Sequence, residues 1–324
     1  MRFSMPENNR CTDFAIAIAW PETYCKQPGY WYDRFTNLLG VSDNHYYKVG
    51  HAALVLINSK TKKCHYFDFG RYVAPFQHGR VRSEITDHGL KVNTLAQISE
   101  DGQRIENYNE ILTELQLNHE CHGEGALHAS YSMIEFEKAY QKVLHLQRRG
   151  PIQYGPFQYK GSNCSRFVNT SILSGKPQWK YAFRLKYFVP LTPTPLNNVN
   201  ALPNKVVIPK LLKTKAFCPA PVSDKRKLKL TLVEPPRMNN IPENAMWLSG
   251  EGSGSWFVIN QKFRNYHISR YGPEGDLECK GIFKIAGNSH FDIILPFQID
   301  HLSHCQRVII NQSENLIALI RIAD

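Results

Sequence analysis

Short apolar runs separated by polar turns dominate the first half of the chain. FAIAIAW (14–20) and HAALVLIN (51–58) are almost entirely apolar, and KCHYFDFGRYV (63–73) alternates aromatic with polar positions. Runs of this length that are bounded by turn residues are typical of β-strands. We therefore expect each of these segments to be a strand.

Two helices are expected between the third of these strands and residue 150. Apolar residues recur at helical spacing over 105–117. A Ser-x-x-Glu capping box at Ser132 and Glu135 predicts a second helix, which ends at two arginines before Gly150 because basic residues and glycine are common helix stop signals. The first part of the chain therefore mixes strands and helices.

The last third has the pattern of an all-β module. Short β-rich segments are separated by Gly, Pro, Asn and Asp: KLKLTLVE, GSWFVIN, YHISRYG, GIFKIAG, FDIILPFQI, RVIINQ and LIALIRI. This pattern predicts a β-sandwich or barrel over 227–324. Together with the mixed first domain, expected at 1–195, it gives an α+β protein with a connector at 196–226.

Charge is concentrated around that connector. Between Lys176 and Lys229 there are twelve Lys or Arg residues, eight prolines and a single acid, Asp224. Proline opposes long helices and central strands, so this stretch is either a solvated basic linker or a contact for an anionic partner such as a membrane surface. Aromatic residues interleave with its first cations, as on a base-stacking surface, but they also suit a strand that packs one face. Without a nucleic-acid motif, we do not expect nucleic acid as the partner.

Length and cysteine content limit the class of protein. A chain of 324 residues, 42% of them hydrophobic, can bury a core and fits two domains. No apolar run is long enough to cross a membrane, and the first twenty residues lack a leader's cleavage pattern, so we expect a cytoplasmic protein with reduced thiols. The eight cysteines form no CxxC and no zinc spacing, and nothing in the sequence indicates a metal or a cofactor.

One cysteine has a distinctive local setting. In GSNCSRFVNTSILSG, Cys164 opens a segment of helical periodicity that Asn163 or Ser162 caps and Gly175 ends. A helix N-terminus favours a thiolate and presents free N–H groups to an oxyanion. Cys164 is therefore either a nucleophile or, as for many cysteines, a small buried apolar residue.

A candidate base lies in the predicted hairpin. If its loop turns at Lys60-Thr61, position 51 lies opposite position 70, and Asp68 shares the face of His51. A shift of one residue would place His65 there instead. By spacing alone, a histidine in this position is more often a core or surface residue than a catalytic one.

Three segments together resemble a known superfamily. VGHAALVLIN, HYFDFGRY and GSNCSRFVN resemble the circularly permuted papain-like hydrolases, which include NlpC-type peptidases and lecithin retinol acyltransferase-like enzymes. NCSRFVN is similar to the Asn-Cys-x-x-Phe-Val stretch of the acyltransferase branch, and the whole chain also resembles a family of bacterial proteins. The resemblance covers 50–175 and implies a papain-like domain in which helices pack on an antiparallel sheet. It also implies Cys164 as nucleophile, His51 as base, and Asp68, or alternatively His65, as the residue that orients the base.

The expected function follows from that site. A Cys164 thiolate paired with His51 would form an acyl-enzyme with a peptide, isopeptide or lipid-like acyl substrate, as a hydrolase (peptidase or amidase) or an acyltransferase. Tyr154 is expected to line the substrate cleft, although a tyrosine beside Gly-Pro also suits a turn. Three arginines, at 71, 80 and 82, are candidates for a substrate carboxylate, with surface exposure as the alternative. The alternative function is a binding or assembly protein that keeps the fold without turnover.

Overall fold

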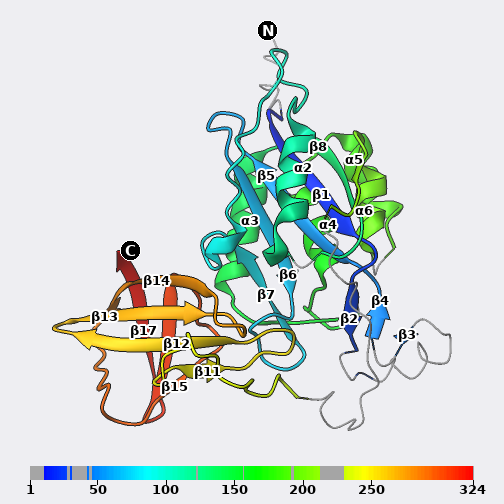
Figure 1. Cartoon of the computed structure of the whole chain (residues 1–324). Helices are drawn as coiled ribbons and strands as arrows, with labels where there is room; N and C mark the ends of the chain where they lie inside the picture. The colour runs from blue at the N-terminus through cyan, green and yellow to red at the C-terminus, as the bar shows by residue number, and fades with distance from the viewer. Residues whose placement is uncertain are drawn as a thin grey trace.

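The chain folds into two domains, a first of strands and helices and a second of strands, seen in a computed structural model (Figure 1). The structure describes residues 11–27, 30, 42–43, 46–121, 123–155, 157–190, 193–211 and 230–323. Each domain is built on a seven-stranded sheet. The predicted two-domain α+β layout agrees with this architecture.

The first sheet is antiparallel throughout and has the order β10-β8-β1-β5-β6-β7-β9. Its strands are β1 (Asp13–Trp20), β5 (His51–Ile57), β6 (Cys64–Gly70), β7 (His78–Ser83), β8 (Leu127–Ile134), β9 (Ile152–Gln153) and β10 (Val206–Ile208). A smaller sheet joins β2 (Tyr24–Lys26), β3 (Ser42–Asp43) and β4 (Tyr46–Lys48). The three strands expected from apolar runs are thus β1, β5 and β6, which lie side by side.

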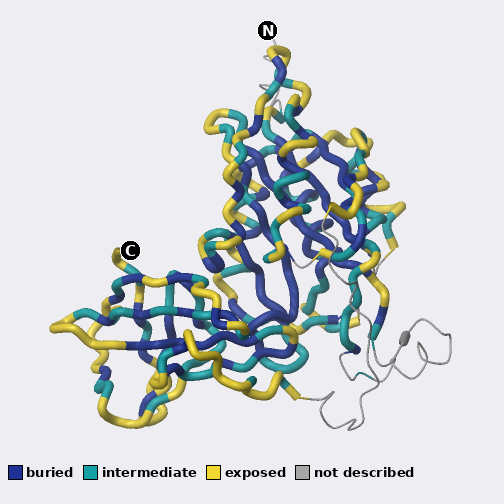
Figure 2. The backbone as a smooth tube through the Cα atoms, viewed as in Figure 1, coloured by how far each residue is buried: buried dark blue, intermediate teal, exposed yellow. Residues whose placement is uncertain are grey.

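Both faces of the first sheet are covered. One face packs on α2 (Tyr108–Leu117), which two 3-10 turns, His88–Leu90 and His119–Cys121, flank in sequence. The other packs on α3 (Phe136–Arg148), α4 (Cys164–Ser174) and α6 (Pro195–Ala201), with α5 (Trp179–Tyr187) against α4 and α6. Burial on both sides explains why the central strands are apolar along their length, and Figure 2 shows them as continuous buried traces.

The two faces of β1 differ in side-chain size. Ile16 and Ile18 belong to the core on the α2 side, whereas Ala15, Ala17 and Ala19 belong to the core that α3 and α4 cover. In β5, Ala52 is on the alanine side. Small side chains leave room for helix backbones to approach the sheet closely.

The second domain is an antiparallel, barrel-like sheet of order β11-β12-β13-β14-β17-β16-β15. Its strands are β11 (Met246–Leu248), β12 (Ser255–Lys262), β13 (Asn265–Tyr271), β14 (Leu277–Ile285), β15 (Gln298–Ile299), β16 (Arg307–Gln312) and β17 (Asn315–Ala323). Phe257, Phe283 and Ile310 are at most 1% exposed in its core. Of the two expected forms, sandwich or barrel, the fold is closer to the barrel.

Two expected strands of this domain do not form as predicted. FDIILPFQI supplies only β15, because Asp292 turns the chain by accepting hydrogen bonds from Ile294 N (2.9 Å) and Leu295 N (3.2 Å). The described part of KLKLTLVE, from Leu230, is irregular.

The expected capping box of the second helix is wrong. Ser132 lies in β8, opposite Ala15 of β1, and α3 begins at Phe136 with Glu135 at the N-cap and no side-chain cap bond. The segment LHASYSMI buries its residues on two faces of the sheet, a strand pattern that the Ser-x-x-Glu match obscured. The predicted helix end holds, because α3 ends at Arg148 and the following Gly150 has φ +73°.

The region around the expected connector contains regular structure. The aromatic stretch is helix α5 and not a strand, and it exposes Trp179, Tyr187 and Phe188. α6 and β10 then pack on the first sheet, so the first domain continues to about residue 208, beyond the expected boundary at 195. Most of the rest of the connector lies outside the described residues.

Buried charges join the two domains. Asp87 accepts two hydrogen bonds from Arg80 (2.7 and 2.6 Å) and one from Arg270 of β13 (3.1 Å). Arg270 also pairs with Glu278 at 2.5 Å. All three members of the Arg80–Asp87–Arg270 group are less than 9% exposed, so Asp87 neutralises cations from both domains.

We expect Asp87→Ala to lower the free energy of unfolding by about 3 to 5 kcal/mol, because it leaves two buried guanidinium groups without their shared carboxylate. Urea denaturation followed by circular dichroism measures this change. The exposed Glu106→Ala is the control and should leave the unfolding curve unchanged. Equal stability of both variants would show that the group does not hold the domains together.

Candidate active site

The candidate site lies where β5 begins. β5 pairs with β6 so that Ala53 is opposite Asp68 and Ile57 is opposite Cys64, which is the register predicted from a turn at Lys60-Thr61. Gly50 precedes the strand with φ +77°, and a Cβ there would lie 2.8 Å from the Trp20 carbonyl oxygen. Only glycine fits this position, so the backbone that presents His51 is tightly defined.

Three side chains besides Cys164 contact the ring of His51, a residue that is 9% exposed. Its Nε2 lies 3.4 Å from Asp68 Oδ2 and 3.4 Å from the Tyr72 hydroxyl. The Trp20 ring stacks on it, with centroids 5.9 Å apart and planes at 16°. Trp20 therefore holds the imidazole on one face, and Asp68 and Tyr72 hold it at one edge.

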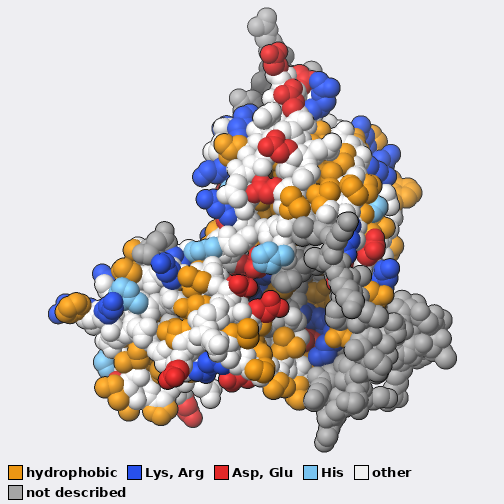
Figure 3. Space-filling view, viewed as in Figure 1, with side chains coloured by type: hydrophobic (Ala, Val, Ile, Leu, Met, Phe, Trp, Pro, Cys, Tyr) orange, Lys and Arg blue, Asp and Glu red, His pale blue; other side chains and the backbone are white. Residues whose placement is uncertain are grey.

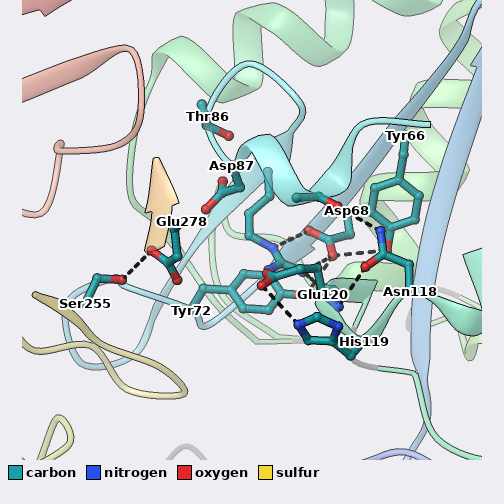
Figure 4. A network of polar contacts seen from close by, with 12 residues as sticks. Tyr66, Asp68, Tyr72, Thr86, Asp87, Asn118, His119, Glu120, Ser255 and Glu278 are labelled. Carbon is teal, nitrogen blue, oxygen red and sulfur yellow. Dashed lines mark hydrogen bonds and ion pairs between the residues drawn. The ribbon is translucent and has the colours of Figure 1, made fainter. Parts of the chain in front are cut away.

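Asp68 has no exposed surface and is saturated with donors (Figure 4). Arg82 of β7 donates to both of its oxygens, from Nε at 3.0 Å and from Nη2 at 2.6 Å. Tyr72 and Tyr66 donate to Oδ2 at 2.8 and 3.2 Å. The carboxylate is thus fixed by a bidentate ion pair and two hydroxyl groups.

These contacts set the pKa values of the acid and the histidine. Burial alone would raise the pKa of Asp68, but the charge of Arg82 and the hydrogen bonds with His51 and Arg82 bring it well below its usual range. Burial alone would lower the pKa of His51, but hydrogen bonds with Asp68 and Cys164 raise it to about 9. His51 is therefore protonated at neutral pH.

Cys164 is the first residue of α4 and is 7% exposed. The Asn163 side chain caps the helix by accepting a hydrogen bond from Arg166 N at 2.8 Å, and Gly175 is the C-cap, as predicted. Burial would raise the pKa of Cys164, but it is lowered by the hydrogen bond and charge of His51, the Tyr154 hydroxyl and the backbone N–H of Ala52. The thiol and the imidazole thus favour a thiolate–imidazolium pair.

The cysteine and the histidine come from opposite faces of the sheet. Cys164 packs with the core on the α4 side, whereas His51 shares a strand face with Ala53, which belongs to the core on the α2 side. They meet because His51 is the first residue of its strand, and the Ala52 N–H contacts the sulfur beside it.

Tyr154 lies on the nucleophile side of the site. Its ring stacks on Phe69 at 5.5 Å, and the Arg71 guanidinium lies 5.1 Å from its centroid. Burial and the nearby Cys164 raise the pKa of its hydroxyl well above the usual value, so it remains a hydrogen-bond donor. The sequence singled out Tyr154 as a residue that lines the substrate cleft, which stays a prediction.

Other candidates from the sequence lie elsewhere. His65 points to the opposite face of β6, where Nδ1 lies 3.0 Å from Glu84 and the ring packs on Tyr140. Two further histidines, His301 and His304, lie in the second domain: His301 contacts the Ser249 carbonyl oxygen at 2.7 Å, and burial lowers the pKa of His304 to about 3, which keeps it neutral.

The three arginines are neither exposed nor available to a substrate carboxylate. Each is less than 9% exposed and pairs with an acid of the protein: Arg71 with Glu251, Arg80 with Asp87 and Arg82 with Asp68. The role of Arg82 was missed because sequence spacing does not show that β7 pairs with β6. The pattern that could have predicted it is the arginine at every second position of HGRVRS, Arg80 and Arg82. A strand that turns charged residues toward a core must supply them with buried partners.

The described residues contain no group of three or more His, Cys, Asp or Glu that could hold a metal ion. In that same part of the chain, no helix is long and apolar enough to cross a membrane. On the face seen in Figure 3, Lys and Arg side chains are scattered over both domains and do not gather into one patch.

The fold and this geometry define an α+β protein with a buried cysteine–histidine–aspartate group. A family model described as type VI secretion system effector TseH-like matches residues 15–181, and the chain belongs to this family. A second model, the DUF6695 C-terminal domain, matches residues 245–322. Among solved structures, a type VI secretion system effector, TseH, is similar at 19% identity and a TM-score of 0.38, over 60% of this chain and 97% of that one. No curated protein matches the chain.

We expect iodoacetamide to alkylate Cys164 at pH 7 faster than the more exposed Cys11 and Cys25, because its thiolate is stabilised. His51→Ala should slow this reaction at least about tenfold, which is the effect of one pKa unit on the thiolate fraction. Mass spectrometry of each cysteine over time measures the rates. His65→Ala is the matched control and should leave them unchanged, whereas equal rates at Cys11, Cys25 and Cys164 would exclude an activated thiol.

Proposed function

We propose that the chain is a cysteine hydrolase of the permuted papain-like type that cleaves amide bonds. The observation that carries this proposal is the placement of His51 between Asp68, 3.4 Å away, and the Cys164 thiol at a helix N-terminus. The chain order supports the permuted arrangement, since the strand of His51 precedes the helix of Cys164. A buried acid that holds an imidazole against a nucleophile is the arrangement used for acyl transfer on several unrelated folds.

The first half of the reaction forms an acyl-enzyme. The Cys164 thiolate attacks the carbonyl carbon, and the oxygen that becomes negative lies at the start of α4, where first-turn N–H groups, that of Cys164 included, lack helical partners. With Nε2 turned toward Asp68, Nδ1 is the nitrogen of His51 left to face the sulfur and the leaving group. His51 gives its proton to the amine nitrogen as the C–N bond breaks.

The second half returns the site to its starting state. Neutral His51 takes a proton from water, and the hydroxide attacks the thioester, so that the acid leaves and the thiolate–imidazolium pair re-forms. Asp68 stays ionised throughout, because Arg82 holds its charge. Its role is to fix the ring and stabilise the imidazolium.

Family membership supports the setting of this reaction. We place the hydrolysis in a cell that receives the protein as a type VI secretion effector, with the expected cytoplasmic location applying to the producing cell. The substrate class is a peptide or isopeptide amide, and a lipid-like acyl group is the alternative that the acyltransferase resemblance offers.

The direct test uses the purified chain with panels of fluorogenic amide, ester and thioester substrates. We expect amide cleavage that Cys164→Ala reduces by about a thousandfold or more, as when a nucleophile is removed. Cys11→Ala changes a part-exposed cysteine that is distant from Cys164 in sequence, and it should keep wild-type activity. Turnover that survives in Cys164→Ala contradicts the proposal, and no turnover with any panel favours the binding or assembly protein.

We expect kcat/KM to depend on pH as a bell. The acid limb, where Cys164 becomes protonated, lies below the ordinary thiol value of 9.0. The alkaline limb lies near pH 9, because above that pH His51 has lost the proton that the leaving group needs. Initial rates from pH 4 to 11 measure both limbs, and an alkaline limb near the ordinary histidine value of 6.5 would show that Asp68 does not act on His51.

A further inference from the structure

The four residues after β6, Arg71–Ala74, lie between the second domain and the candidate site. The Gly252 N–H donates to the Arg71 carbonyl oxygen at 2.6 Å, and the Glu251 N–H donates to that of Ala74 at 3.2 Å. At Gly250 a Cβ would lie 2.3 Å from the Tyr72 carbonyl oxygen, so only glycine allows this contact. The loop between β11 and β12 is therefore apposed directly to the segment.

Glu251 anchors this contact with its side chain. It is 2% exposed, accepts a hydrogen bond from Arg71 Nη1 at 2.6 Å, and accepts another from the Gln77 N–H at 2.8 Å. The other end of the Arg71 guanidinium donates to Cys25 Sγ at 2.9 Å. A buried, fully engaged guanidinium has little freedom to move.

The segment contacts both halves of the catalytic group. The Tyr72 hydroxyl donates to Asp68 at 2.8 Å and lies 3.4 Å from His51 Nε2. The Arg71 guanidinium covers the ring of Tyr154, whose hydroxyl donates to Cys164. Adjacent residues thus hold the base on one side and the nucleophile on the other.

We propose that the C-terminal domain is a functional part of the active site, and that Glu251 is a positioning residue that acts through Arg71 on Tyr154 and Cys164. This inference rests on the proposed function, since it assigns the second domain a role in the same site. The carboxylate that orients Arg71, that of Glu251, comes from the second domain. The first domain alone therefore lacks the residue that holds Arg71 over Tyr154 and, through it, the Tyr154 hydroxyl at the sulfur.

The sign of one measurable shift separates positioning from a direct charge effect. A carboxylate repels a thiolate. Removing the negative charge of Glu251 would therefore, through the direct charge effect alone, stabilise the thiolate and lower the pKa of Cys164. Loss of positioning acts in the opposite direction, because Tyr154 no longer holds its hydroxyl at the sulfur and the pKa of Cys164 rises.

The experiment compares the full chain with Glu251→Gln, Glu251→Asp and the matched control Glu278→Gln, which removes a carboxylate that pairs with Arg270 at the domain interface. The rate of Cys164 alkylation is measured from pH 4 to 10, and thermal unfolding is measured in parallel. We expect the midpoint for Glu251→Gln to move to higher pH and its rate at pH 7 to fall about tenfold. Glu251→Asp should recover part of that loss, and Glu278→Gln should keep the wild-type midpoint.

Three outcomes would overturn the inference: an unchanged midpoint in Glu251→Gln, a shift to lower pH, or equal shifts in both Gln variants, which would mean general loosening of the interface. If Glu251→Gln does not fold, Arg71→Lys tests the same step, because lysine keeps the charge but loses the flat group over Tyr154. Alkylation requires no turnover, so a shift without detectable hydrolysis would reject the proposed function and keep the positioning role.

Discussion

The charge states of the site depend on the ion pair between Asp68 and Arg82. A carboxylate without exposed surface would ordinarily take up a proton, since burial disfavours its charged form. Two guanidinium hydrogen bonds, at 3.0 and 2.6 Å, keep Asp68 ionised, and an ionised Asp68 in turn keeps His51 protonated. The lowered pKa of Cys164 depends on that imidazolium, so the charge of a buried arginine stabilises the thiolate indirectly, through Asp68 and His51.

Sequence reasoning succeeded where a local rule determines the geometry. Strand alternation and a turn at Lys60-Thr61 placed Asp68 on the face of His51, with His65 as the alternative for a shifted register, and the observed pairing has the first register. Cap preferences placed Cys164 in the first turn of a helix. It failed where strand pairing or the second domain supplies the partner: Arg82 reaches Asp68 only because β7 pairs with β6, and Glu251 reaches Arg71 only from the second domain. Tyr72 is close to Asp68 in sequence, but it follows the end of β6, where strand alternation no longer predicts the direction of a side chain.

The errors in secondary structure have a common physical cause. Ser132 and Glu135 match a helix cap, but hydrogen bonding to β1 continues the strand as far as Ile134. The aromatic residues from Trp179 alternate loosely enough to suit either period, and contacts with α4 and α6 select the helix. In each place tertiary contacts override a weak local preference, which a single sequence does not reveal.

The layer of side chains between α4 and strands β5 and β6 separates two groups that different elements carry. His51 is fixed to the sheet, whereas Cys164 is carried by α4, which rests on β6 and on the face of β5 that includes Ala52. The separation of sulfur and imidazole therefore depends on the thickness of a packed layer as well as on the hydrogen bond between them. Each added methyl group in that layer would lift the helix, so side-chain volume far from the chemistry becomes a means of adjusting the reactivity of the thiol.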